Sequence, residues 1–129
     1  MIVVDSAAIV DALTGAEGTD DLRASLVTED LHAPALLDYE VVSALRGLTL
    51  EKHLTAARAQ DALSDFEDLP LHRWRYSAPL RLRAFSLRDT MTAYDAAYVA
   101  LAEALDCPLV TRDARLAHAV GHGVEIRVR

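Results

Sequence analysis

Residues 1–13 read MIVVDSAAIVDAL, and they predict a buried strand that leads directly into a helix. The apolar run of residues 1–4 is typical of a strand that is covered on both faces. Asp5 and Ser6 then open a helix to about Leu13, and Gly15 and Gly18 are placed to end it. A strand followed at once by a helix is the unit of parallel α/β sheets, so this stretch indicates the fold class.

The same alternation continues along the chain. Further helices are predicted over residues 20–28, from Pro34 to Gly47, and over residues 55–66, 78–88, 93–105 and 113–119. Further strands are predicted over residues 31–33, 69–71, 108–111 and 124–128. The pattern predicts an α/β fold formed by a single domain, residues 1–129, with a mainly parallel central sheet flanked by helices on both faces.

The composition fits this expectation. Hydrophobic residues make up 52% of the 129 residues but aromatic residues only 5%, so Ala, Leu and Val must fill most of the core. Cys107 is the only cysteine, which excludes an intrachain disulfide and a cysteine-based zinc site. No apolar run approaches the roughly 20 residues that span a bilayer. Because the first residues also lack the positive charge of a signal peptide, we expect a cytoplasmic protein without membrane contact.

The formal net charge of −7 argues against a general nucleic-acid coat protein, which would be basic. An enzyme that reaches phosphate through bound metal remains compatible with that charge. The one basic stretch runs from His72 to Arg88. It is either a solvated helix face or a rim that contacts RNA phosphates. Within it, Trp74 and Tyr76 are candidates for base stacking, although Trp74 fits the core equally well.

Four acidic residues occupy informative positions. Asp5 and Asp113 follow predicted strands, so both are expected near the carboxyl edge of a parallel sheet, where ligands usually bind. Each could also be a simple helix N-cap. Asp95 lies in the first turn of the clearest helix, where its spacing from Thr92 resembles a capping box. Glu40 shares a helix face with apolar residues, and a carboxylate there needs a partner or a metal.

Taken together, the four acids favour a shared metal site over a separate local role for each acid. Hard cations such as Mg²⁺ and Mn²⁺ prefer carboxylate and water oxygens, and two such ions can clamp the oxygens of a phosphodiester. A zinc site at His118 and His122 is not expected. The histidines have the spacing of a helical pair, but Ala119 stands where that motif needs glutamate, and Gly121 interrupts the helix.

Four segments of the chain, each carrying one of these acids, resemble the acidic motifs of PIN-domain toxins of the VapC type. They are IVVDSAA (residues 2–8), LLDYEVVSALR (36–46), YDAAYVALA (94–102) and LVTRDARL (109–116). Their order and spacing both match the family pattern, and they run from the first residues almost to the end. The resemblance implies a PIN-like fold over the whole chain.

The resemblance further implies a metal-dependent endoribonuclease that acts as the toxin of a toxin–antitoxin pair. RNA would be hydrolysed by metal-activated water, with Mg²⁺, or alternatively Mn²⁺, as cofactor. The implied catalytic and metal-binding residues are Asp5, Glu40, Asp95 and Asp113. Ser6 and Thr111 are candidates for supporting hydroxyl groups. Arg112 is a candidate for phosphate contact, although pairing with an acid is an equally simple role.

The expected partners are the RNA substrate, a VapB-type antitoxin and a second copy of the chain in a homodimer. The antitoxin is expected to insert an arginine into the acidic pocket and to make apolar contacts near residues 36–66. The alternative function is a PIN-fold module that binds RNA or protein without catalysis. Such a module would tolerate the loss of acids, so the presence of all four favours an enzyme.

Overall fold

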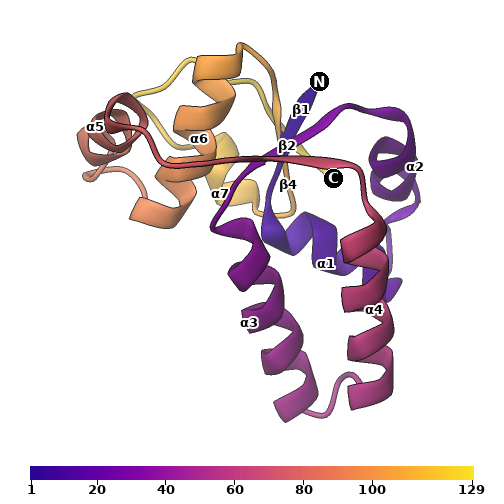
Figure 1. Ribbon diagram of the computed structural model, residues 1–129. Helices are drawn as coiled ribbons and strands as arrows, with labels where there is room; N and C mark the ends of the chain where they lie inside the picture. The colour runs from indigo at the N-terminus through magenta and orange to yellow at the C-terminus, as the bar shows by residue number, and fades with distance from the viewer.

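The computed structural model describes residues 1–129 as a parallel five-stranded sheet surrounded by helices (Figure 1). The strands are β1 (Ile2–Val4), β2 (Leu31–Pro34), β3 (Leu71–Trp74), β4 (Leu109–Thr111) and β5 (Ile126–Val128). Their order across the sheet is β3-β2-β1-β4-β5, and every neighbouring pair is parallel. The predicted fold class is therefore confirmed.

Seven helices connect the strands. They are α1 (Ser6–Thr14), α2 (Asp20–Thr28), α3 (Leu37–Leu50), α4 (Ala56–Asp68), α5 (Ala78–Ser86), α6 (Ala93–Leu105) and α7 (Ala114–Ala117). Helix α6 packs on β1, β2 and β4 and against α5, whereas α1 packs against α2, α3 and α4. Helices α3 and α4 extend away from the sheet as a pair joined by a short loop (Figure 1). None of the helices is long and apolar enough to cross a bilayer.

Small aliphatic side chains form most of the core, as the composition predicts. The central strands β1 and β4 are buried along their full length. Phe66 is the one fully buried phenylalanine, and Trp74 keeps 41% of its surface exposed, so Trp74 is not a core residue. The two best-buried strands end directly before Asp5 and Arg112, and this arrangement sets the position of the acidic residues.

Three predicted boundaries were wrong by about three residues, and several others differ by one or two. Pro34 is the last residue of β2 and does not open a helix, since α3 begins at Leu37. Gly47 lies inside α3, which continues to Leu50. Because intrahelical bonds hold this turn, one glycine lowers helix stability without ending the helix.

The third wrong boundary is that of β3, which spans Leu71–Trp74 and not residues 69–71. Pro70 cannot donate a backbone hydrogen bond, so it precedes the strand. The residues that pair with β2, Leu71–Trp74, include polar side chains because β3 is an exposed edge strand, so they lack the apolar pattern of a buried strand.

Candidate metal centre

Asp5 and Asp113 meet at the carboxyl edge of the sheet because β1 and β4 are neighbours, with Val4 opposite Val110. The Asp5 carboxylate caps α1, since its Oδ1 accepts a hydrogen bond from the Ala8 N–H at 2.9 Å. The fully buried Thr111 hydroxyl donates to Asp5 Oδ2. Thr111 Oγ1 in turn accepts from the Asp113 N–H at 3.0 Å. Thr111 therefore fixes the position of both acids, and Asp5 is a cap that also faces the other carboxylates.

The environment of Asp5 disfavours its ionised form. Burial raises the pKa of the Asp5 carboxyl, and the negative charges of Asp95 and Asp113 raise it further. The hydrogen bonds from Thr111 and Ala8 lower the pKa and offset part of this effect. A cation at this position would relieve the repulsion among the three acids.

Glu40 reaches the same site from α3, where Tyr98 of α6 holds it. The Tyr98 hydroxyl donates to Glu40 Oε1 at 2.6 Å, and Tyr98 is only 3% exposed. Burial raises the pKa of the Glu40 carboxyl, as do the charges of Asp5 and Asp95, while the Tyr98 bond lowers it. Burial and the bond to Glu40 raise the pKa of Tyr98, so its hydroxyl acts as a donor; Ser6 also contacts this hydroxyl.

Tyr98 was missed as a functional residue in the sequence. The available signal was its position three residues after Asp95, on the buried face of the same helix. A buried tyrosine needs a partner for its hydroxyl, and an acid is the strongest acceptor.

Asp95 differs from the other acids in having no partner. The predicted cap is present, since the Asp95 N–H donates to Thr92 Oγ1 at 3.1 Å. The Asp95 carboxylate itself makes no hydrogen bond or ion pair, so the second half of a capping box is absent. Its charge nevertheless raises the pKa of both Asp5 and Glu40, so the three carboxylates repel one another.

Asp113 carries its own counter-ion. Arg115 Nη2 lies 2.7 Å from Asp113 Oδ2, and Arg115 Nε lies 3.0 Å from Oδ1. The hydrogen bond with Arg115 lowers the pKa of the Asp113 carboxyl. The Arg115 side chain is 87% exposed and can leave the acid without exposing apolar surface. The spacing of two residues was the sequence signal for this pair.

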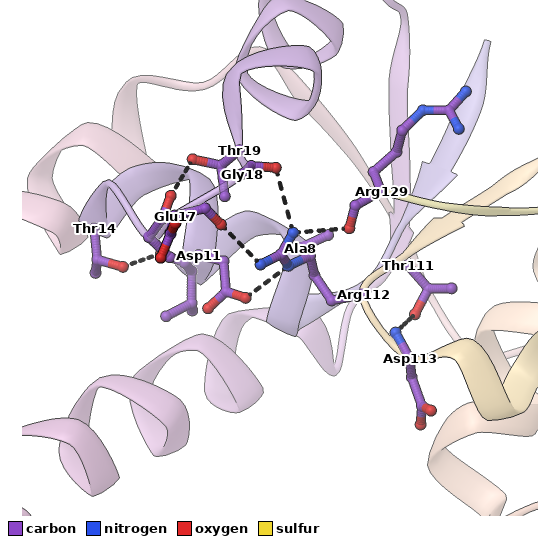
Figure 2. A network of polar contacts seen from close by, with 12 residues as sticks. Ala8, Asp11, Thr14, Glu17, Gly18, Thr19, Thr111, Arg112, Asp113 and Arg129 are labelled. Carbon is purple, nitrogen blue, oxygen red and sulfur yellow. Dashed lines mark hydrogen bonds and ion pairs between the residues drawn. The ribbon is translucent and has the colours of Figure 1, made fainter.

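Arg112 points away from the four acids of the candidate site and connects distant segments of the chain by hydrogen bonds (Figure 2). Its Nε donates to Asp11 Oδ2 at 2.9 Å. Its other nitrogens donate to the carbonyl oxygens of Glu17, Gly18 and Arg129, at 3.2, 3.5 and 2.9 Å respectively. Pairing with an acid, one of the two roles considered, is what the structure shows, and hydrogen bonds within the chain engage four of the five guanidinium N–H groups.

The donor atoms at this edge suit a hard divalent cation. All four side chains offer carboxylate oxygens, and such ligands are preferred by Mg²⁺ and Mn²⁺. No three of them bring one oxygen each within 4.8 Å of the others. Mg²⁺ usually keeps several waters and uses one or two carboxylates directly, so the wider spacing fits that ion.

The basic stretch divides into bound and unbound arginines. Arg73 pairs with Asp38 at 2.6 Å, and Arg83 pairs with Glu103 at 2.7 Å. Other members of the stretch line a groove of about 520 Å³ that reaches the start of α6 at Ala93 and Tyr94. Its polar and aromatic lining includes Trp74, Arg75, Tyr76, Arg81, Phe85, Arg88 and Tyr94.

The fold is a parallel α/β sheet, and four acidic side chains that suit a hard divalent cation lie toward its carboxyl edge. Residues 2–121 match the PIN domain family, and the chain belongs to that family.

Curated relatives match along nearly the whole chain. Ribonuclease VapC1 of Mycobacterium tuberculosis (strain ATCC 25618 / H37Rv) is 43% identical over 127 residues, which cover 98% of this chain and 96% of that protein. Ribonuclease VapC12 of the same strain is 38% identical, with 99% and 98% coverage.

The fold is also that of solved structures. PAE2754 from Pyrobaculum aerophilum superimposes with a TM-score of 0.72 at 22% identity, covering 98% of this chain and 83% of that one.

Proposed function

We propose that this chain is a metal-dependent endoribonuclease that acts as the toxin of a toxin–antitoxin pair. The similar proteins that match along nearly its full length are named VapC ribonucleases. The observation that carries the proposal is the unpartnered Asp95 carboxylate beside two acids whose pKa values are raised. Such an arrangement is unfavourable without a cation and favourable with one.

In this proposal Asp5 and Asp95 are the direct metal ligands, and Glu40 and Asp113 act through water. Thr111 orients Asp5, and Tyr98 orients Glu40. Ser6 supports Tyr98 from the start of α1. When bound, Mg²⁺ or Mn²⁺ would lower the pKa of a bound water and stabilise charge on the phosphoryl oxygens.

The groove beside α6 is the proposed path of the RNA. Arg75, Arg81 and Arg88 line it and make no ion pair within the chain. Trp74 and Tyr76 lie in the same groove, with 41% and 79% of their surfaces exposed. Exposed aromatic rings between arginines suit a single strand, because bases stack on the rings while phosphates contact the guanidinium groups.

The proposed antitoxin of the VapB kind binds across α3 and α4. A shallow apolar groove of about 280 Å³ lies between these helices and is lined by Val42, Leu45, Leu50, Ala59 and Leu63, among others. It falls within residues 36–66, where the apolar contact was expected. Since Glu40 lies on α3, a peptide in this groove can extend an arginine toward the acids. The homodimer stays a prediction that sedimentation of the purified chain would test.

The test is to express the chain alone in cells and to sequence the new RNA 5′ ends. The wild type should produce new ends that carry 5′-phosphate, whereas Asp95→Asn should produce none. Asp89→Asn is the matched control, because Asp89 is exposed and makes no ion pair. It should cleave like the wild type. Equal cleavage by the wild type and Asp95→Asn, both properly folded, would refute the assigned role of Asp95.

A further inference from the structure

Asp30, His32 and His72 bring one metal-ligating atom each within 4.8 Å of one another. His32 and His72 are partners in the register of β2 and β3, so both rings project from the same face of the sheet. Asp30 comes two residues before His32 and shares that face. His32 Nε2 lies 2.8 Å from Asp30 Oδ2, and His72 Nε2 lies 3.4 Å from Oδ1. The ring nitrogens thus face one carboxylate.

This cluster lies apart from the carboxyl-edge acids. Leu31 pairs with Ile2, so Asp30 is level with Met1 in the sheet. Asp5 lies four residues after Met1 along the chain. At about 3.3 Å per residue, the two sites are separated by about 13 Å along the strand direction. A residue that serves one site therefore does not reach the other.

We infer that Asp30, His32 and His72 bind a transition metal ion such as Zn²⁺, and that this ion ties the edge strand β3 to β2. Two imidazole nitrogens and one carboxylate oxygen suit Zn²⁺, Ni²⁺ or Cu²⁺, whereas Mg²⁺ prefers oxygen ligands alone. The inference does not depend on the proposed ribonuclease function. Under this inference, the four acids at the carboxyl ends of the strands prefer Mg²⁺, whereas the cluster of Asp30, His32 and His72 prefers Zn²⁺.

The cluster is buried on one side and open on the other. The His32 side chain is only 8% exposed, while Asp30 and His72 are 52% and 67% exposed. The buried ring supplies a fixed ligand, and the exposed side chains can adjust to the ion. With three protein ligands, the fourth position of a tetrahedral Zn²⁺ is left to water.

Trp74 connects this site to a signal that can be measured. Its indole N–H donates to His32 Nδ1 at 2.9 Å. Because the indole nitrogen can only donate, His32 Nδ1 carries no proton, and the ring proton lies on Nε2 toward Asp30. Metal binding at Nε2 displaces that proton to solvent, and the neutral ring is reprotonated at Nδ1. The hydrogen bond from Trp74 is then lost, and Trp74 is the only tryptophan of the chain.

The test is calorimetric titration of the untagged, full-length protein with Zn²⁺ in millimolar Mg²⁺, which occupies the oxygen-only acids. One Zn²⁺ should bind per chain, raise the melting temperature and shift the Trp74 fluorescence. His72→Ala and Asp30→Asn change exposed side chains and should keep the fold. Each should weaken Zn²⁺ binding by about tenfold or more, since even supporting residues of metal sites contribute that much.

His53→Ala is the matched control. His53 lies 3.6 Å from Glu51 on the surface, which gives a histidine–carboxylate pair without a third ligand. This variant should bind Zn²⁺ like the wild type and show the same fluorescence change. The inference is overturned if the wild type binds no Zn²⁺, or if His72→Ala and Asp30→Asn bind it with unchanged affinity.

Discussion

The hydrogen bond between Tyr98 and Glu40 offers the sharpest test of the site geometry. Tyr98→Phe removes one hydroxyl from a side chain that is 3% exposed, and the bond it breaks is 2.6 Å long. A hydrogen bond to a charged group contributes about 1.5–3 kcal/mol to stability. We therefore expect a loss of about 2 kcal/mol in the free energy of unfolding at neutral pH. For a chain of this length, that corresponds to a melting temperature lower by about 6–8 °C.

The pH dependence of this loss has a definite sign. The Tyr98 bond lowers the pKa of Glu40, so it is stronger to the carboxylate than to the protonated acid. Below the pKa of Glu40, the bond joins two neutral groups and is about half as strong. The cost of Tyr98→Phe should accordingly fall to about 1 kcal/mol in acid.

Urea denaturation in the presence of a chelator measures these free energies. Tyr94→Phe is the control on the same helix, because Tyr94 is 65% exposed, and its cost should be within about 0.5 kcal/mol of zero. A double-mutant cycle with Glu40→Ala should give a coupling energy of about 2 kcal/mol at neutral pH. If Tyr98→Phe costs as much in the Glu40→Ala background as in the wild type, the loss arises from packing and the argument from the bond is wrong.

Three further predictions concern charge. Without metal, the raised pKa values of Asp5 and Glu40 mean that these two groups contribute stability below their ordinary pKa values, and this contribution should be lost as pH rises through the raised ones, whereas Asp113, whose pKa is lowered, acts in the opposite direction. Saturating Mg²⁺ should reverse that loss, adding about 2.7 kcal/mol at a hundredfold excess over Kd, and thermal scans should show almost no such gain for Asp95→Asn. Arg112→Ala should lower the free energy of unfolding by about 2 kcal/mol in urea denaturation, because the guanidinium joins α1 to Arg129. Arg127→Ala breaks only a local surface pair and should change this free energy by less than about 0.5 kcal/mol. Equal effects of the two substitutions would show that Arg112 has no structural role. Two divalent ions would change the formal charge from −7 to −3, so RNA affinity at fixed ionic strength should rise with Ca²⁺ or Mg²⁺ relative to chelator, and equal affinity in all three conditions would show that the arginines bind RNA without metal.

The sequence predicted the elements whose signal is local. Helix α6 begins and ends as expected because Thr92 caps it and its apolar residues recur with helical period. The strand β3 was misplaced because its position depends on pairing with β2, which no local pattern records. For the same reason, the cluster of Asp30, His32 and His72 was not foreseen, since residues 42 apart in the sequence meet only through strand register.

The acidic positions were predictable, but their individual partners were not. Family resemblance and strand position together selected Asp5, Glu40, Asp95 and Asp113 as candidates, and their role as metal ligands stays a prediction. The contact between Tyr98 and Glu40 joins residues 58 apart, and the orientation of Arg112 depends on where the carbonyl oxygen of Arg129 lies. Such contacts follow from the packing of whole elements, so the sequence left the role of Arg112 open.

The measurement that tests the central claim most directly is cleavage of a labelled single-stranded RNA by the purified chain. The account predicts cleavage with Mg²⁺, none with chelator, and none with Asp95→Asn even at saturating Mg²⁺, while Asp89→Asn cleaves like the wild type. Cleavage that continues in chelator, or that survives in folded Asp95→Asn, would contradict the claim that these acids hold the metal that drives hydrolysis.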